Sequence, residues 1–403
     1  MNVLEKANKI LLQPICDHCL GRQFAQLLSG YGNEERGKII RAIVAMSIDN
    51  ENFESGLDLS NFADYKFHNL EIKKKIKEGK CVICDDFFKN LDKWIEKIEK
   101  RSNFEFKTFL IGTKLSSELT AQEEDLWESV GIDYCEPLKA EINREIGKRI
   151  EKKLKKKCNL KSPDVNFIVN ISKNSVDAEI NPIFIYGEYQ KLIRGIPQTR
   201  WPSGKYKTSI EQITAKPYML ATRGSAHKLH GLGREDIDAR CLAWRPFVLE
   251  IIAPKVRDID LKKFAKKIAK AVRIRNVRFS DIVEVRKIKE SKLDKTYHCI
   301  VICEKIEKKD LKRLNAIVGE IRQKTPRRVL HRRADKLRKR KVISIKTKFV
   351  NRKKFLLTVR GEAGLYVKEL ISGDEGRTVP SISSLLGQKC ECKDLDVMEI
   401  HKK

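Results

Sequence analysis

Two short cysteine pairs constrain the folding of this chain more than any other feature. The first is Cys16-Asp-His-Cys19, and the second, Cys81-Val-Ile-Cys84, follows after residues 20–80. A structural zinc ion takes four thiolates in a tetrahedron, and one CxxC turn presents two sulfurs to the same ion. We therefore predict that Cys16, Cys19, Cys81 and Cys84 bind one structural Zn²⁺, which requires the chain to fold back so that the two pairs meet.

The residues around the pairs leave alternatives open. The four thiols could be ordinary buried side chains. A dithiol redox role is disfavoured because no thioredoxin-like strand, CxxC and helix unit surrounds either pair. His18 lies inside the first pair and could contribute to the site, while Gly21 would give the following turn backbone freedom.

Charge separates the chain into two halves. The chain has 84 Lys and Arg against 55 Asp and Glu, a formal net charge of +29, and the whole of this excess falls in residues 191–403. A positive field of this size is typical of proteins whose partner carries many phosphates. We predict a nucleic-acid partner that contacts the densest basic stretch, Arg327–Lys341, although a merely solubilising surface is the alternative.

Several classes of function are excluded. The chain has no apolar run of the roughly 18 to 20 residues that a membrane helix needs, and its first residues lack a signal-peptide core, so we expect a cytoplasmic protein without a membrane partner. Gly32–Lys38 has the glycine and lysine spacing of a phosphate-binding loop, but Ile39 stands where Ser or Thr would hold magnesium. No GxGxxG follows a strand. We therefore expect no nucleotide or organic cofactor, and nothing in the sequence indicates a protein partner.

The apolar pattern predicts an α+β protein of two domains. Residues 1–190 read as a helical part followed by an α/β module, and turn residues over 195–204 place the boundary near residue 190. Residues 191–403 read as a mostly antiparallel sheet with flanking helices, because two helices return to successive strands. The expected helices are 2–12, 22–28, 34–47, 89–100, 261–272 and 310–321, and the expected strands are 164–171, 182–186, 246–252, 279–285, 296–301, 342–350 and 355–359.

The segment Gly231-Leu-Gly-Arg-Glu-Asp236 is the best candidate for chemistry. Its two glycines allow a sharp bend that brings a carboxylate to a strand edge. On the local sequence alone, however, Asp236 is more typical of a helix cap.

This segment resembles the pseudouridine synthases. Gly233-Arg-Glu-Asp236 matches the G-R-x-D loop that carries the catalytic aspartate in the tRNA pseudouridine synthase A branch. Lys295-Thr-Tyr297 and Gly364-Leu-Tyr-Val-Lys368 resemble the second and third motifs of that family, in the same order. The cysteine pairs, residues 195–202 and residues 392–396 make the chain similar to the archaeal-type enzyme. That enzyme joins a zinc-bearing, THUMP-type RNA-binding half to a C-terminal catalytic half.

The resemblance implies an enzyme that isomerises uridine 54, uridine 55 or both in the T-arm of tRNA to pseudouridine. Residues 1–190 would be the zinc-binding and THUMP-type RNA-binding region, and residues 191–403 the catalytic domain with the pseudouridine synthase fold. Asp236 would attack the ribose or abstract its 2′ proton, and the sequence leaves both routes open. The enzyme would flip the target base out of its stack.

The resemblance also implies a set of substrate-binding residues. Arg234 would fill the space that the flipped nucleotide leaves, and Lys368 would be the cation that keeps Asp236 ionised. Tyr297 and Tyr366 would contact the base. Val367 and Leu395 would form apolar walls. For Tyr297, Val367 and Leu395, ordinary core packing is the alternative.

Two rival functions remain at this stage. A non-catalytic tRNA-binding protein would account for the charge and the cysteine pairs. Another THUMP-type tRNA-modifying enzyme, such as a methyltransferase or a thiouridine synthetase, is disfavoured because the sequence contains neither a cofactor-binding glycine loop nor a pyrophosphatase loop.

Overall fold

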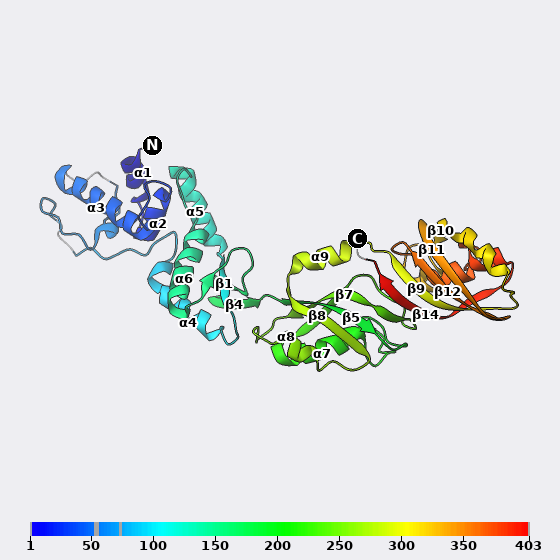
Figure 1. Ribbon diagram of the computed structural model, residues 1–403. Coiled ribbons are helices and arrows are strands. Elements are labelled where there is room, and N and C mark those ends of the chain that lie inside the picture. Colours follow the sequence, from blue (N-terminus) through cyan, green and yellow to red (C-terminus); the bar gives the residue numbers. More distant parts are fainter. Residues whose placement is uncertain (1, 52–55, 72–74, 402–403) are drawn as a thin grey trace. The chain divides into compact units, whose positions relative to one another are not determined.

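The chain folds into two compact units, Met1–Asn181 and Pro182–Lys403, in a computed structural model that describes residues 2–51, 56–71 and 75–401 (Figure 1). Both units mix helices and strands, as the α+β prediction requires. The division falls after Asn181 rather than near residue 190. The reason is that Ile183–Lys191 forms strand β5, whose pairing partners β7 (Arg240–Ile252) and β8 (Val272–Ser280) belong to the second unit.

The first unit joins a helical part to a small four-stranded sheet. The strand order is β2-β1-β3-β4, with β1 parallel to β2 and β3, and β4 antiparallel to β3. Helix α6 packs against β1. The elements are α1 (Val3–Ile10), α2 (Asp17–Gly21), η1 (Arg22–Phe24), α3 (Asn33–Glu51), η2 (Leu59–Phe62), η3 (Phe87–Asn90), α4 (Leu91–Lys100), β1 (Thr108–Lys114), α5 (Ser117–Val130), α6 (Leu138–Leu154), β2 (Lys157–Cys158), β3 (Val165–Asn170) and β4 (Ser175–Ile180).

Two long helices of this unit were not predicted. Helix α5 begins where the Ser116 hydroxyl accepts a hydrogen bond from the Leu119 N–H at 3.2 Å. Helix α6 begins after Pro137, and its buried Ile142, Ile146 and Ile150 recur every four residues along one face. The helix predicted over 22–28 is shorter than expected, since it ends as a 3₁₀ turn at Phe24.

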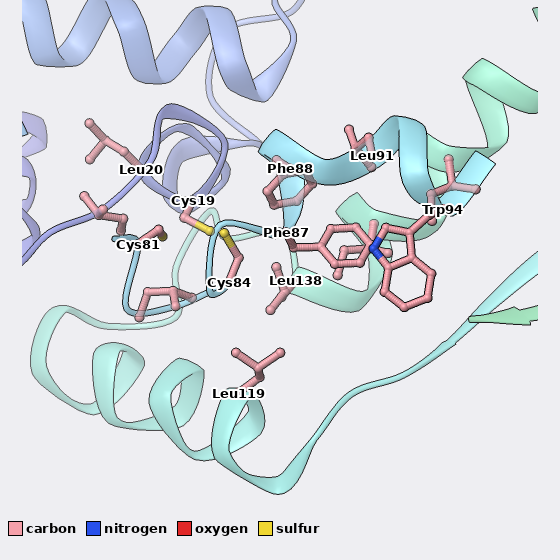
Figure 2. Close-up of a cluster of buried hydrophobic side chains, with 14 of the residues drawn as sticks. Cys19, Leu20, Cys81, Cys84, Phe87, Phe88, Leu91, Trp94, Leu119 and Leu138 are labelled. Carbon is pink, nitrogen blue, oxygen red and sulfur yellow. The ribbon is translucent and has the colours of Figure 1, made fainter. Parts of the chain in front are cut away.

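The core of the first unit encloses the second cysteine pair. Cys81 and Cys84 are each 1% exposed, and Phe87 stacks on Trp94 with ring centroids 5.5 Å apart. Figure 2 shows these side chains packed together with leucines from α4, α5 and α6. The cysteine turn is therefore part of the hydrophobic core.

Helices α2 and α3 approach so closely that only glycine fits between them. A Cβ atom on Gly21 would overlap the Asn33 carbonyl, and one on Gly37 would overlap the Asp17 carbonyl. Gly21 itself has a helical φ of −65°. The prediction that Gly21 supplies backbone freedom is therefore wrong, because the position needs glycine for its lack of a side chain.

The second unit is built on a ten-stranded sheet. The strand order is β13-β10-β11-β12-β9-β14-β7-β5-β8, and β6 pairs with β7 off this path. Neighbouring strands are antiparallel except β14 and β7, which run parallel. Besides β5, β7 and β8, the elements are α7 (Ile210–Thr222), β6 (Ala226–Gly231), α8 (Leu261–Ala265), α9 (Ile282–Glu290), β9 (Lys295–Cys303), η4 (Asp310–Ile317), β10 (Gly319–Lys324), η5 (Arg327–Arg332), β11 (Leu337–Asn351), β12 (Lys354–Gly361), α10 (Val367–Ser372), β13 (Thr378–Val379), α11 (Ile382–Leu386) and β14 (Cys390–Ile400).

Several boundaries in this unit differ from the predictions, and three of them change the type or the length of an element most. The strand predicted over 279–285 is wrong, because Asp281 accepts a hydrogen bond from the Glu284 N–H at 2.9 Å and starts helix α9. The helix predicted over 310–321 ends at Ile317, and Ile321 lies in strand β10. The helix predicted over 261–272 ends at Ala265.

Within the described ranges, no helix combines the length and the apolar character that crossing a bilayer requires.

The glycine contact between α2 and α3 gives a stability prediction. We expect Gly37→Ala to lower the free energy of unfolding by about 1 to 3 kcal/mol, since the new methyl group overfills a closed contact. Gly147→Ala is the matched control. A Cβ on Gly147 in helix α6 meets no atom within 4 Å, so this change should stabilise the protein by up to about 1 kcal/mol. Thermal denaturation of the two variants measures both effects. Equal melting temperatures would contradict this account of the α2–α3 contact.

Candidate active site

The seven site residues predicted in the second unit all line one cavity. Its volume is about 240 Å³. The residues come from four parts of the chain that are far apart in sequence, and the predicted members are Arg234, Asp236, Tyr297, Tyr366, Val367, Lys368 and Leu395. The structure thus brings together the three motif segments and the last strand.

Asp236 lies on a turn between β6 and β7. Gly233 has φ +66°, a left-handed conformation that favours glycine. The Ala239 N–H donates to the Asp236 carbonyl at 3.1 Å, and strand β7 follows at Arg240. Because no helix begins after Asp236, its interpretation as a helix cap is wrong.

A buried ion pair holds the backbone of this turn. The side chains of Glu235 and Arg245 are both fully buried, with Arg245 Nε 3.1 Å from Glu235 Oε2. Arg245 also donates to the Leu232 carbonyl at 2.6 Å, and the Tyr189 hydroxyl donates to Glu235 Oε2 at 3.0 Å. The side chain of Glu235 is therefore buried, whereas that of the next residue, Asp236, is partly exposed within the cavity.

Two further side chains bind the carbonyls of the turn. Gln198 Nε2 donates to the Gly233 carbonyl at 2.9 Å. Lys191 Nζ donates to the Asp236 and Ile237 carbonyls at 3.2 and 2.8 Å. Burial lowers the pKa of Lys191, which has no exposed surface. The turn is thus fixed mainly by groups that lie beneath it.

Two cations face the Asp236 carboxylate. Arg328 Nη1 lies 3.0 Å from Oδ1, and Lys368 Nζ lies 3.6 Å from Oδ2. Lys368 is closer to Asp238, at 2.6 Å. Burial raises the pKa of Asp238, but the hydrogen bond and charge of Lys368, a backbone hydrogen bond and the charge of Arg328 together outweigh burial and leave this pKa below its usual value. Lys368 therefore lies beside Asp236, although its shortest contact is with Asp238.

Aromatic and apolar side chains form the other walls. Tyr297 on β9 pairs across the sheet with Val397 on β14, and burial raises the pKa of Tyr297 to about 12, so its hydroxyl stays protonated at neutral pH. The Tyr366 hydroxyl accepts a hydrogen bond from Arg333 at 2.9 Å. Burial, together with the charge of the nearby Arg245, lowers the pKa of Lys295 to about 8. The cavity thus has a flat apolar part beside several cations.

Arg234 is exposed at the mouth of this cavity. It also lines an adjoining cavity of about 360 Å³, together with Asp236 and Arg328. In this second cavity, Trp201 and Tyr206 meet edge to face with ring centroids 5.6 Å apart. Arg234 therefore reaches two adjoining spaces without a hydrogen bond or ion pair to the described residues.

Several residues of this site were not predicted from the sequence. Arg328 was assigned only to a phosphate-binding stretch, and Glu235, Arg245 and Lys191 were not expected to support the turn. One signal was available for Arg245. This arginine is the only charged residue between Cys241 and Leu249 of strand β7, and a charged side chain within such an apolar stretch is buried only with a partner.

The four predicted cysteines meet in the first unit. The Sγ atoms of Cys16, Cys19, Cys81 and Cys84 all lie within 4.8 Å of one another. His18 lies beside this cluster and is not a member of it. Its Nδ1 lies 2.9 Å from Glu141 Oε1, and its ring stacks on Phe88.

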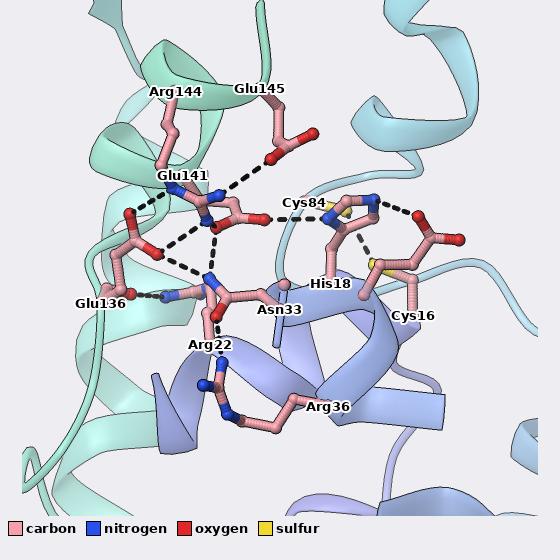
Figure 3. A network of polar contacts seen from close by, with 12 residues as sticks. Cys16, His18, Arg22, Asn33, Arg36, Cys84, Glu136, Glu141, Arg144 and Glu145 are labelled. Atoms are coloured by element: carbon pink, nitrogen blue, oxygen red, sulfur yellow. Dashed lines mark hydrogen bonds and ion pairs between the residues drawn. The ribbon is translucent and has the colours of Figure 1, made fainter. Parts of the chain in front are cut away.

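A polar network surrounds the cysteine cluster. Glu141 on α6 is fully buried and contacts His18, Asn33 and Arg144. Figure 3 shows how these contacts join α2 and α3 to α6. The first cysteine pair is thus linked through His18 to the helix that packs on the sheet of the first unit.

Comparison with known proteins gives matches along most of the chain. Residues 184–401 match the family described as Pus10, C-terminal, and residues 94–170 match the archaeal Pus10 THUMP domain. The chain is 40% identical to the tRNA pseudouridine synthase Pus10 of Methanocaldococcus jannaschii, over 96% of this chain and 92% of that protein. It is 38% identical to the protein of the same name from Pyrococcus furiosus, over 99% of this chain and 98% of that protein. Among solved structures, a Cbf5-Nop10-Gar1 complex aligns at 18% identity with a TM-score of 0.32, over 52% of this chain and 47% of that chain.

The buried ion pair gives a prediction for the turn. We expect Glu235→Gln to lower the free energy of unfolding by about 3 to 5 kcal/mol, since Arg245 would remain buried without its counter-charge. Glu375→Gln is the control, because Glu375 forms an exposed pair with Arg327, and its loss should change stability by less than about 1 kcal/mol. Differential scanning calorimetry measures both. Similar small effects in the two variants would show that the Glu235–Arg245 pair does not support the turn.

Proposed function

The chain belongs to the Pus10 family, and from this membership we propose that it is a tRNA pseudouridine synthase. One observation supports the proposal most strongly. Asp236, the two tyrosines and Lys368 come from three motif segments, and all line one cavity of about 240 Å³. A pocket that combines a carboxylate, aromatic rings and cations suits a flipped nucleotide.

The proposed reaction breaks the bond between N1 of uracil and C1′ of the ribose, rotates the base and rejoins it through C5. It is neutral in redox terms and consumes no nucleotide, which agrees with the expected lack of an organic cofactor. The Asp236 carboxylate would act as the nucleophile or as the base. Arg328 and Lys368 both face this carboxylate and offset its negative charge.

The remaining cavity residues would hold the flipped base. Tyr297 keeps its proton and presents an aromatic ring for stacking, which is worth about 1 to 3 kcal/mol per base in other proteins. Tyr366, Val367 and Leu395 would complete the walls. Arg234 is free to enter the space that the base leaves, since it is exposed and has no hydrogen bond or ion pair within the described part of the chain.

We propose that the target is uridine 54, uridine 55 or both in the T-arm of tRNA. Support comes from the resemblance to the archaeal-type enzyme and from the match of residues 94–170 to a THUMP domain. The basic stretch Arg327–Lys341 would contact phosphates, which position RNA without reading its sequence. The nearly neutral first unit would instead contribute recognition of tRNA shape.

We also infer that the four cysteines hold Zn²⁺. Zn–S bonds of about 2.3 Å in a tetrahedron separate the sulfurs by about 3.8 Å. Cys16 Sγ and Cys84 Sγ are 3.6 Å apart, and the buried Arg22 guanidinium interacts with Cys19, which offsets thiolate charge. Zinc would cross-link the turns of the two cysteine pairs. It would take part in no step of the reaction.

The catalytic proposal predicts that Asp236→Asn abolishes the reaction and leaves binding intact. We expect turnover on an unmodified tRNA transcript to fall by about 1,000-fold or more, because the amide can neither attack nor take a proton. Chemical mapping of pseudouridine measures the product, and filter binding measures the tRNA affinity, which should change less than about threefold.

Asp238→Asn is the matched control, two residues away on the same turn. It removes a contact to Lys368 that lies outside the proposed chemistry, so most activity should remain. Activity in Asp236→Asn but not in Asp238→Asn would move the reacting carboxylate to Asp238. Activity in both variants would contradict a catalytic aspartate on this turn, whereas a wild type that binds tRNA and forms no pseudouridine would favour a non-catalytic tRNA-binding protein.

The zinc proposal predicts about one zinc ion per chain in the purified protein. Cys81→Ser should release it and lower the melting temperature of the first unit, because metal binding and folding are coupled. Cys158→Ser is the control, since Cys158 is exposed and lies outside the cluster. Elemental analysis measures the metal content. A zinc-free native protein, or equal zinc content in both variants, would overturn the assignment.

A further inference from the structure

Arg328 lies between two carboxylates at the edge of the cavity. Its Nη1 is 3.0 Å from Asp236 Oδ1, and its Nε is 2.7 Å from Glu369 Oε1. Its Nη2 lies 3.5 Å from Glu369 Oε2. One guanidinium therefore joins the carboxylate on the β6–β7 turn to a carboxylate on helix α10.

Glu369 is a fixed support for this contact. Its side chain is only 6% exposed. The helix that carries it is anchored at its start, where the Tyr366 N–H donates to Gln323 Oε1 and Gln323 Nε2 donates to the Tyr366 carbonyl, both at 3.0 Å. Gln323 itself has no exposed surface. Glu369 thus holds one side of the guanidinium in a set orientation.

Lys368 does not replace Arg328 in this arrangement. Its ammonium lies 2.6 Å from Asp238 and 3.6 Å from Asp236, so Arg328 is the closer cation to the reacting carboxylate. The planar guanidinium can also contact two carboxylates along different edges, whereas an ammonium acts as a point charge. A group that contacts both carboxylates must do so along different edges, because Asp236 lies on the β6–β7 turn and Glu369 lies on helix α10.

We propose that Arg328 is a positioning residue for the reaction, held by Glu369 and holding the Asp236 carboxylate in its reactive orientation. This inference rests on the proposed function. It assigns Arg328 a role beyond the phosphate contacts of its basic stretch. Small displacements of a reacting group cost up to about 100-fold in rate, so the effect should fall on turnover.

The test compares Arg328→Met, Arg328→Lys and Glu369→Gln in the full chain, with unmodified tRNA transcript as substrate. We expect Arg328→Met to lower kcat by about 10- to 100-fold, while KM and the tRNA Kd change less than about threefold. Arg328→Lys should have a higher kcat than Arg328→Met, since lysine keeps the positive charge but lacks the planar guanidinium that contacts two carboxylates. Glu369→Gln should lower kcat by a smaller factor.

The double variant Arg328→Met with Glu369→Gln tests whether the two residues act as one unit. Its kcat should match that of Arg328→Met alone, because Glu369 acts through Arg328. Arg278→Met is the control, since Arg278 pairs with Glu284 outside both cavities and its loss should leave kcat unchanged.

Three outcomes would overturn the inference. An unchanged kcat in Arg328→Met would do so, and so would multiplicative losses in the double variant. A rise in KM and Kd with kcat intact would show that Arg328 only binds phosphate. In each case an active wild type leaves the proposed function standing, whereas an inactive wild type contradicts both.

Discussion

The buried pair of Glu235 and Arg245 is the interaction on which the geometry of the site depends. The side chain of Glu235 is fully buried against Arg245, whereas that of the next residue, Asp236, is partly exposed and faces Arg328 in the cavity. Arg245 belongs to β7, and Tyr189, which also binds Glu235, belongs to β5. Two paired strands thus set the orientation of one carboxylate. The turn is held in place by side chains of the sheet.

The same cations can serve binding and chemistry. Arg328, Lys368 and Arg333 line the cavity around Asp236, and they belong to the half of the chain that carries the positive excess. A field of this sign attracts phosphates at long range and stabilises a carboxylate at short range. The orientation of the Asp236 carboxylate then depends on the cation that a second side chain holds in place. That cation is Arg328, which Glu369 holds.

Motifs in the sequence indicated the residues of the site better than they indicated their contacts. The cysteine spacing and the three motif segments could be recognised because each is short and local. The pairing of Arg328 with Asp236 joins residues 92 positions apart, and it depends on the path of the chain between β10 and β11. Helix α9 was misread because a few apolar residues fit a strand as well as a helix, and the cap at Asp281 decided the outcome. Helices α5 and α6 were missed because their polar faces obscured the apolar spacing.

The position of strand β14 has a consequence for how the protein is made. β14 is the last strand of the sheet in sequence order, yet it lies between β7 and β9 and supplies Leu395 and Val397 to the cavity. During synthesis, β7 and β9 therefore leave the ribosome with facing edges unpaired, and unpaired edges invite association with other chains. The cavity closes only after residues 390–400 have emerged, so a nascent chain can hold every motif up to Lys368 and still lack a complete site.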